Sequence, residues 1–392
     1  MNGINNSIKN LNSIKKYKIL YLMTTCEVGG AAEYLYSFLK EIKKAGSYEL
    51  SLIVNPDGLY YNRFLEVFDH IFEIKELKAK FDLLSDITAF MKIYKIIKKN
   101  KFDLIHIQTS KASFLGALAA KFTKNNNVVF SAHGYNSAHA TMNFLSDKFY
   151  LYLRKIIVNN SIFIAVASQT VKNFIINNTK ADSKKVEVIY TGVNFEKFSY
   201  ERRNSKQGNK NKFIIGSCGR LIEIKGHEFL IRAAKLVIGE RNDINFLIYG
   251  DGPLKKYLND LIIELKMEKN FIIKDFTENI SEQMIDFDIY VQPSMMDSFP
   301  LAPCEAMAMG IPVITTKVGG FPEMVNQGVN GYLVDFNDCN DLKNRILDII
   351  NDSDKRKKFG INAYEHAVKN FNWSHVANKY DEIYKNIFAN IN

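Results

Sequence analysis

Cysteine, tryptophan and proline are scarce in this chain of 392 residues, which has 4 Cys, 1 Trp and 7 Pro. The cysteines stand far apart, and no two of them have the Cys-x-x-Cys spacing of a zinc site or a redox pair. This pattern excludes a disulfide framework and favours a reducing compartment, which we expect to be the cytoplasm. No metal site is expected either, because the histidines do not cluster at ligand spacing.

Long apolar runs are absent as well. The longest apolar-rich stretch, residues 144–158, contains Asp147, Lys148, Arg154 and Lys155 and is shorter than the roughly 20 residues that span a bilayer. The first seventeen residues are polar and lack the apolar core of an export signal. We therefore expect neither a transmembrane helix nor export.

Positive charge is concentrated in the first half of the chain. Residues 1–198 hold 27 Lys and Arg against 16 Asp and Glu, whereas residues 199–392 hold 25 against 26. A general Lys and Asn bias of the composition explains this excess as well as a function does. The functional interpretation is attraction to anionic lipid head groups or a phosphate-bearing acceptor at the inner face of the cytoplasmic membrane. Nucleic acid is not expected as a partner, because its usual binding motifs are missing.

Short β-branched and aromatic runs alternate with helical segments, and this alternation occurs twice. The pattern predicts an α/β protein with two doubly wound parallel sheets. We expect a first domain over residues 1–198, a charged linker over 199–212 and a second domain over 199–372. An amphipathic helix over about 373–392 should pack back on the first domain. Ligands of such folds bind beyond the carboxyl ends of the strands, so we expect the site in a cleft between the domains.

The most informative stretch runs from Val291 to Val325. A strand ends at Pro293, and a helix is expected from Pro300 or Leu301 to Gly310. Its N-terminus would present free N–H groups to a phosphate. Asp297 lies in the loop and Glu305 one turn into the helix, so both could face one ligand. In the alternative interpretation, Asp297 caps the helix and Glu305 is a solvated helix residue.

Residues 297–325 resemble the Glu-x7-Glu motif of retaining glycosyltransferases of family 4, which have the two-domain GT-B architecture. The resemblance implies two Rossmann-like domains facing across a cleft, with Asp297 near the donor sugar and Glu305 on the nucleotide ribose. It also assigns donor binding to Ser298, Phe299, Pro300 and Leu301. In one departure, Asp297 replaces the first Glu of the motif, which shortens its reach.

Further motifs resemble the same family. The segment GRLIEIKG, residues 219–226, matches its GRL-x3-KG motif and implies that Arg220 and Lys225 neutralise the donor diphosphate. The alternative is a pair of surface cations. Gly29 and Gly30 match its GGAE segment and would let backbone approach a phosphate or sugar.

The histidines divide into two groups. His133 follows an expected strand at the family's position for an active-site histidine, and His139 falls in the loop after it. His106 lies inside an expected strand, where a structural role is favoured. The Asp-x-Asp pair of Asp286 and Asp288 is also given a structural role, because it matches the family's helix-to-strand junction rather than a metal site.

Together these matches imply a retaining glycosyltransferase that needs neither a cofactor nor a metal. Its donor would be a nucleotide-sugar, most simply UDP-hexose or UDP-N-acetylhexosamine, and its acceptor a glycan or a polyprenyl-diphosphate-linked saccharide in surface polysaccharide assembly. Catalytic roles are assigned to His133, Arg220, Lys225 and Asp297. Two rival functions are a nucleotide-sugar epimerase of the same fold and a non-catalytic partner of another transferase. The sequence does not fix the oligomeric state.

Overall fold

The computed structural model describes residues 16–27, 29–44, 46–134, 144–206 and 212–390. The N-terminal segment 1–15, on which most of the expectation about export rests, lies outside these residues. Among the described residues, no helix is both long and apolar enough to cross a bilayer.

A seven-stranded sheet occupies the first half of the chain, with strand order β3-β2-β1-β4-β5-β6-β7. β1 pairs in parallel with β2 on one side and with β4 on the other. The strands are Tyr17–Thr25 (β1), Tyr48–Asn55 (β2), His70–Glu73 (β3), Leu104–Ile107 (β4), Val128–Ala132 (β5), Phe163–Val166 (β6) and Val186–Val188 (β7). The helical segments are Gly30–Lys44 (α1), Tyr60–Val67 (α2), Leu83–Asn100 (α3), Ser110–Phe122 (α4), Phe144–Asn159 (α5), Gln169–Thr179 (α6), Ser183–Lys185 (η2) and Tyr200–Lys206 (α7).

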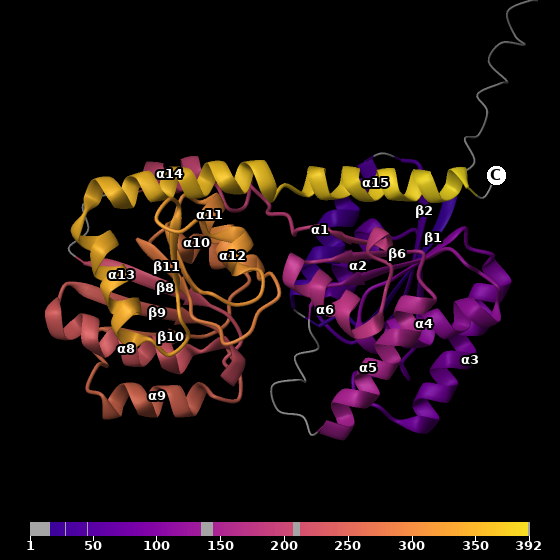
Figure 1. The fold of residues 1–392 in the computed structure, drawn as a ribbon, viewed down its shortest axis with the longest axis horizontal. Helices are drawn as coiled ribbons and strands as arrows, with labels where there is room; N and C mark the ends of the chain where they lie inside the picture. Colours follow the sequence, from indigo (N-terminus) through magenta and orange to yellow (C-terminus); the bar gives the residue numbers. More distant parts are fainter. Residues whose placement is uncertain (1–15, 28, 45, 135–143, 207–211, 391–392) are drawn as a thin grey trace, which may run out of the picture. The chain divides into compact units, whose positions relative to one another are not determined.

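A six-stranded parallel sheet follows, with strand order β10-β9-β8-β11-β12-β13. Figure 1 labels its strands β8, β9, β10 and β11. Its strands are Phe213–Cys218 (β8), Ile244–Tyr249 (β9), Phe271–Lys274 (β10), Ile289–Gln292 (β11), Val313–Thr316 (β12) and Gly331–Val334 (β13). Its helical segments are Glu223–Lys225 (η3), His227–Glu240 (α8), Lys255–Glu264 (α9), Ile280–Met284 (α10), Leu301–Ala308 (α11), Phe321–Met324 (α12), Cys339–Asn351 (α13) and Ser353–Asn370 (α14), and the chain ends with Trp373–Ala389 (α15).

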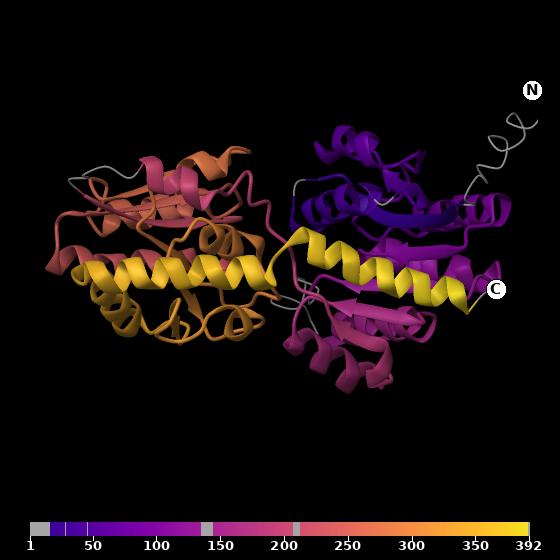
Figure 2. The ribbon, with the colours of Figure 1, turned by 90° about the horizontal axis from the view of Figure 1, so that it is seen from above.

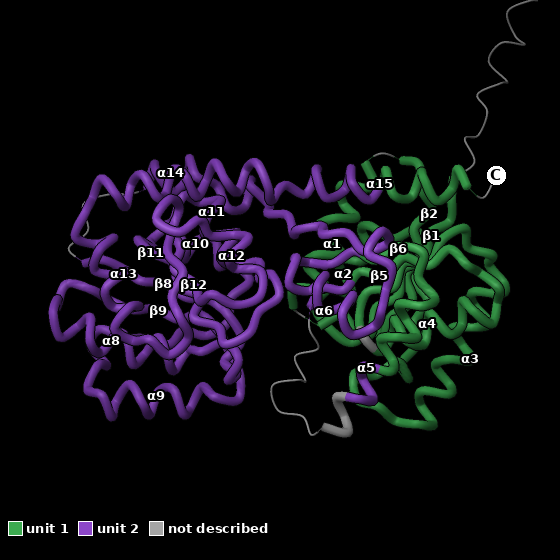
Figure 3. The backbone as a smooth tube through the Cα atoms, viewed as in Figure 1, with its two compact units in different colours: residues 1–131, 152–164, 381–392 green, residues 132–151, 165–380 purple. Residues whose placement is uncertain are grey.

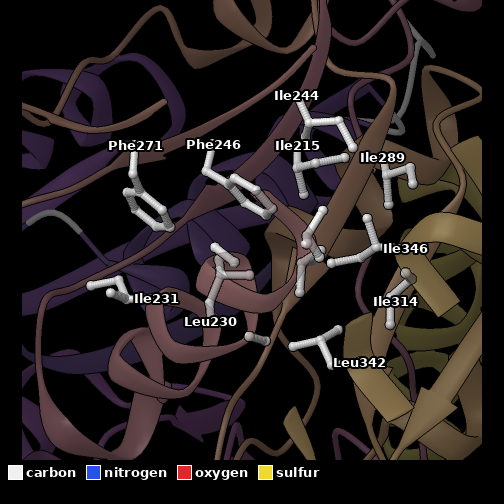
Figure 4. Packing of buried hydrophobic residues seen from close by; sticks show 14 of the residues in the cluster. Ile215, Leu230, Ile231, Ile244, Phe246, Phe271, Ile289, Ile314, Leu342 and Ile346 are labelled. Atoms are coloured by element: carbon white, nitrogen blue, oxygen red, sulfur yellow. The ribbon is translucent and has the colours of Figure 1, made fainter. Parts of the chain in front are cut away.

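Burial on both faces explains why the central strands are nearly continuous apolar runs. All four residues of β4, β11 and β12 are buried, as expected for parallel strands covered by helices on each side. In the second sheet, side chains of β8, β9, β10 and β11 meet those of α8 and α13 in one apolar cluster (Figure 4). Phe246 and Phe271 stack there with ring centroids 5.4 Å apart.

The chain forms two compact units, shown in different colours in Figure 3. The first is built from residues 1–131, 152–164 and 381–392, and the second from residues 132–151 and 165–380. The division passes through β6, so α6 and β7 belong to the second unit. The expected domain limits of 1–198 and 199–372 stay a prediction.

The C-terminal helix α15, drawn in yellow in Figures 1 and 2, ends in the first unit. Phe388 stacks on Tyr17 with centroids 4.0 Å apart. The Tyr384 hydroxyl lies 2.9 Å from that of Tyr21, and the Tyr48 hydroxyl donates to Asp381 Oδ1 at 2.6 Å. The expected fold class is confirmed, with two doubly wound parallel sheets and a C-terminal helix that packs on the first.

Two segments differ from the sequence prediction. β3 was not expected, because its residues HIFE are polar at both ends and only its two central side chains are partly buried. The expected linker 199–212 contains a helix, α7, where Arg203 is buried and donates to the backbone oxygens of Phe287 (2.7 Å) and Gly310 (3.2 Å). A charged side chain that caps buried carbonyls leaves no apolar period for sequence analysis to detect.

Candidate functional site

The central point of the second sheet lies between β8 and β11, where the strand order changes direction. These two strands are adjacent and parallel, so their carboxyl ends lie at one edge. Lys225 follows β8 at the end of η3, and Asp297 follows β11 in the loop before α11. Such a switch point is where open α/β sheets bind ligands.

Lys225 and Asp297 form a partly buried ion pair at this point. Lys225 Nζ lies 2.6 Å from Asp297 Oδ2, and the two side chains are 20% and 14% exposed. Backbone contacts hold the two loops together, because Met295 N–H donates to the Ile224 oxygen at 2.8 Å. Gly226 has a positive φ of 67°, and a Cβ added there would lie 2.0 Å from the Pro293 oxygen. Only glycine therefore permits this approach of the two loops.

A buried chain of hydrogen-bonded polar groups leads from β8 and β11 to Asp297. The Tyr290 hydroxyl accepts from Cys218 N–H at 3.3 Å and donates to Gln292 Oε1 at 2.7 Å. Gln292 Nε2 donates to Ser294 Oγ at 3.0 Å, and that hydroxyl donates to Asp297 Oδ2 at 3.2 Å. Burial raises the pKa of Tyr290 far above its usual value, so its hydroxyl stays protonated and can donate. Sequence analysis missed these residues, although polar residues at alternate positions of an apolar strand were a signal.

Helix α11 begins directly after this loop, and its N-cap is Pro300. Proline has no side chain that can cap the helix, so Asp297 does not have the capping role of the alternative interpretation. Leu301 is the first helical residue, and Ser298 and Phe299 are buried before it. Glu305 follows one turn later and is partly buried. Burial, and after it the negative charge of Glu305, raise the pKa of the Cys218 thiol.

The turn before α12 packs against the Asp297 loop. A Cβ added to Gly319, whose φ is 55°, would lie 1.4 Å from the Asp297 oxygen. Glu323 fixes this turn, because its two carboxylate oxygens accept from Gln169 N–H at 2.9 Å and one accepts from the Tyr190 hydroxyl at 3.0 Å. The Tyr190 ring stacks on Phe299 with centroids 4.9 Å apart. Sequence analysis quoted this segment but gave Glu323 no role.

Two other basic residues lie in or directly after the loop that follows β8. Arg220 is exposed two residues beyond the strand. His227 starts α8 and is buried, and burial, followed by the charge of Lys225, lowers its pKa to about 4. It is therefore neutral near pH 7, and Arg220 and Lys225 carry the positive charge of this loop.

His133 lies one residue beyond β5 and is assigned to the second unit. Desolvation lowers its pKa to about 4, so the imidazole is neutral near pH 7. A Cβ added to the next residue, Gly134, would lie 2.7 Å from Ser298 Oγ. The His133 segment therefore borders the loop that carries Asp297. His139 lies outside the described residues.

The glycines of the first unit stand at the start of α1. Gly30 is its first residue, and the Gly29 oxygen accepts from Glu33 N–H at 3.1 Å. A Cβ added to Gly29 would meet no atom within 4 Å, so this backbone borders open space. Glu33 accepts from Ser37 Oγ at 2.6 Å and from the Tyr60 hydroxyl, which orients α1 against α2.

The expected structural roles agree with the geometry. His106 is fully buried, and its ring nitrogens lie 2.6 Å from the Tyr384 hydroxyl and 2.7 Å from Ser131 Oγ. Asp288 Oδ2 accepts from Ile214 N–H at 2.8 Å, which joins it to β8. In the part of the chain that the structure describes, no group of three or more His, Cys, Asp and Glu side chains is placed to hold a metal ion.

Comparison with known proteins identifies the class. A family model described as Glycosyltransferase Family 4 matches residues 28–197, and one described as Glycosyl transferases group 1 matches residues 199–366. With its two Rossmann-like sheets and the paired charges at the switch point of the second, the protein is a glycosyltransferase of GT-B fold. The chain belongs to glycosyltransferase family 4.

Three similar proteins illustrate the range of the family. An uncharacterized glycosyltransferase of Methanocaldococcus jannaschii is 30% identical over 352 residues, covering 88% of this chain and 91% of its own. The Escherichia coli UDP-Gal:alpha-D-GlcNAc-diphosphoundecaprenol alpha-1,3-galactosyltransferase is 26% identical over 318 residues, covering 78% and 81%. The crystal structure of Anabaena HepE in complex with UDP and glucose superposes with a TM-score of 0.79 at 23% identity, covering 94% of this chain and 100% of that one.

Proposed function

We propose that this glycosyltransferase moves a hexose or N-acetylhexosamine from a UDP-sugar to a glycan or polyprenyl-diphosphate-linked saccharide in the assembly of a surface polysaccharide or glycoconjugate. One observation carries the proposal: Lys225 and Asp297 meet at the switch point, and the Asp297 loop leads into α11, the helix that contains Glu305. The similar Escherichia coli galactosyltransferase uses UDP-galactose and a diphosphoundecaprenol acceptor by its name, and HepE is similar in fold and binds UDP.

Each polar group has a distinct task on the donor. Arg220 and Lys225 neutralise the diphosphate, and the N–H groups at the start of α11 support the same negative charge. Glu305 accepts hydrogen bonds from the ribose hydroxyls. Asp297 accepts hydrogen bonds from Lys225 and Ser294, and we assign it to the donor sugar. Ser298, Phe299, Pro300 and Leu301 shape the donor pocket.

Residues beyond this loop complete the assignment. We assign the neutral imidazole of His133 to a hydrogen bond with the donor sugar, for which a pKa of about 4 keeps it uncharged. The backbone of Gly29 and Gly30 is assigned to a phosphate or sugar oxygen, because a Cβ added to Gly29 would meet no atom within 4 Å.

The proposed reaction retains the anomeric configuration without a protein nucleophile. The bond between the anomeric carbon and the leaving diphosphate oxygen breaks, and the acceptor hydroxyl oxygen bonds to the same face of the sugar. The acceptor proton passes to the leaving diphosphate. Lys225 and Arg220 supply the charge that a divalent ion supplies in other transferases, so we propose that no metal is required.

We further propose that the protein works at an anionic membrane on the cytoplasmic side. The support is the charge excess of residues 1–198, which hold 27 Lys and Arg against 16 Asp and Glu. A lipid-linked acceptor would be presented at such a surface, and basic residues are attracted to it by about 1 kcal/mol each.

The test is a donor screen with mass-spectrometric detection of the product. Purified protein is incubated with UDP-hexoses, UDP-N-acetylhexosamines and GDP-mannose, with and without polyprenyl-diphosphate-linked acceptors. We expect a product whose mass increases by one sugar residue with a UDP-sugar and an acceptor. Conversion of the donor to an isomer without acceptor would instead assign an epimerase, and donor binding without turnover would assign a non-catalytic partner.

A further inference from the structure

An exposed apolar face on α3 is not explained by the proposed donor site. Leu84, Ile87 and Met91 are 79%, 54% and 45% exposed. Their spacing of three and four residues places them on one face of the helix. The opposite face carries Ala89, Ile93 and Ile97, which are buried in the first unit. One face of α3 is therefore buried in the core, and the opposite, exposed face is also apolar in the first two turns of the helix.

We call Leu84, Ile87 and Met91 the α3 apolar face. The exposed apolar surface extends beyond these three residues. Leu83, beside Leu84, is 76% exposed. Phe122 at the end of α4 is 66% exposed, and its ring contacts that of Phe90 on α3 with centroids 5.9 Å apart. Single exposed apolar side chains are ordinary, but a contiguous group of this kind marks an interaction surface.

The surroundings of this face are basic. Residues 75–99 contain seven lysines and three acidic residues. The acidic side chains are already engaged: Asp86 pairs with Lys111, Glu76 pairs with Lys92 at 2.7 Å, and Asp82 accepts from Ser85 N–H at the start of α3. The lysines thus dominate the charge that this surface presents.

Along the exposed face of α3, the apolar side chains come first and lysine side chains follow them. Lys95 and Lys98 continue the spacing of Leu84, Ile87 and Met91, and both are exposed. The face is therefore apolar at its N-terminal end and basic at its C-terminal end. A helix with this arrangement can bury apolar side chains at the acyl boundary while lysines remain at the level of the lipid phosphates.

We propose that the α3 apolar face inserts into the interfacial layer of an anionic lipid bilayer, with Lys95 and Lys98 on the head groups. A lipid bilayer is the occupant favoured by the charge, because it offers an apolar layer and anionic groups side by side. The proposal deepens the proposed membrane association by naming the element that makes the contact. It does not depend on catalytic activity.

Vesicle co-sedimentation with the full chain tests this proposal. The vesicles contain equal parts of phosphatidylglycerol and phosphatidylcholine, or phosphatidylcholine alone. Leu84→Gln with Ile87→Gln removes the apolar face. The matched control is Leu65→Gln with Ile263→Gln, which changes a leucine and an isoleucine that are 56% and 59% exposed elsewhere, on α2 and α9. Thermal unfolding verifies that both double variants are folded.

We expect the unmodified protein to bind the anionic vesicles. The α3 variant should lower the partition coefficient about tenfold or more, and the control should leave it unchanged. Lys95→Gln with Lys98→Gln should weaken binding to the anionic vesicles by about tenfold or more at low salt but change little on neutral ones. Equal loss in both double variants, or no vesicle binding, would overturn the proposal.

One further outcome would assign the face differently. If the protein forms a concentration-dependent dimer in sedimentation velocity that Leu84→Gln with Ile87→Gln abolishes, and vesicles do not bind, then a second copy covers the face. Each of these outcomes leaves the proposed transfer reaction untouched, because the vesicle experiment contains no donor.

Discussion

Replacing Lys225 by methionine should separate catalysis from folding at the candidate site. The substitution keeps most of the aliphatic stem and removes the charge that lies 2.6 Å from Asp297. In the proposed reaction, the leaving diphosphate gains about one negative charge. At about 4 Å and an effective dielectric constant of about 20, a unit charge interacts with an ammonium group by about 4 kcal/mol. We therefore expect kcat to fall by roughly a hundredfold to a thousandfold.

The assay is a measurement of initial rates over a range of donor concentrations. Lys343→Met is the matched control, because Lys343 Nζ also lies 2.6 Å from a carboxylate, that of Glu240, and its side chain is likewise 20% exposed. We expect the control to retain the kcat of the unmodified enzyme. A near-normal kcat in Lys225→Met, or an equal loss in Lys343→Met, would refute the assignment of Lys225 to the diphosphate.

Four further predictions use other parts of the site. Glu305→Gln should mainly raise the donor KM, by a factor that corresponds to a loss of roughly 1.5 to 3 kcal/mol of binding free energy, because the ribose bonds change little during the reaction. In the same kinetics, a lower kcat with an unchanged KM would contradict this. Glu323→Ala should lower the free energy of unfolding by roughly 1 to 3 kcal/mol in urea titrations, because it leaves Gln169 N–H and the Tyr190 hydroxyl without their acceptor, and Glu323→Gln should lose less. His227 has a folded pKa of about 4 against the usual 6.5, so only the unfolded chain binds a proton between these values. This histidine should thus contribute roughly 3 kcal/mol to the fall in stability as pH drops through that window, and His227→Gln should remove its share of the slope, with that of His133 remaining. Activity should survive EDTA, and complete loss restored by Mg²⁺ or Mn²⁺ would contradict a metal-independent mechanism.

Much of the fold could be predicted because its strands are buried on both faces. A parallel strand that is buried on both faces is mostly apolar, so β1, β8 and β12 are visible as apolar or β-branched runs. β3 could not be found, since its ends are exposed and polar. α7 was missed because its buried residue is Arg203, whose burial depends on two backbone oxygens from distant segments. Tertiary hydrogen bonds of this kind have no local period.

In the candidate site too, some residues could be predicted from the sequence and others could not. Lys225, Asp297 and Glu305 could be proposed because they lie in segments that resemble motifs of family 4 and that follow expected strand ends. The hydrogen-bonded chain that supports Asp297 was missed, because the alternate polar residues Tyr290, Gln292 and Ser294 show their shared role only when their side chains are packed together. The contact of Glu323 with Gln169 joins residues 154 positions apart in the sequence. Such a contact leaves no trace in the spacing of either segment.

A transfer assay with paired variants tests the central claim most directly. The donor that gives product in the mass-spectrometric screen is used with the unmodified enzyme, Arg220→Ala and Lys225→Met, each verified to be folded. We predict an acceptor one sugar residue heavier with the unmodified enzyme and a rate at least about a hundredfold lower in each variant. Undiminished transfer in both variants would contradict the claim that the loop after β8 holds the donor diphosphate.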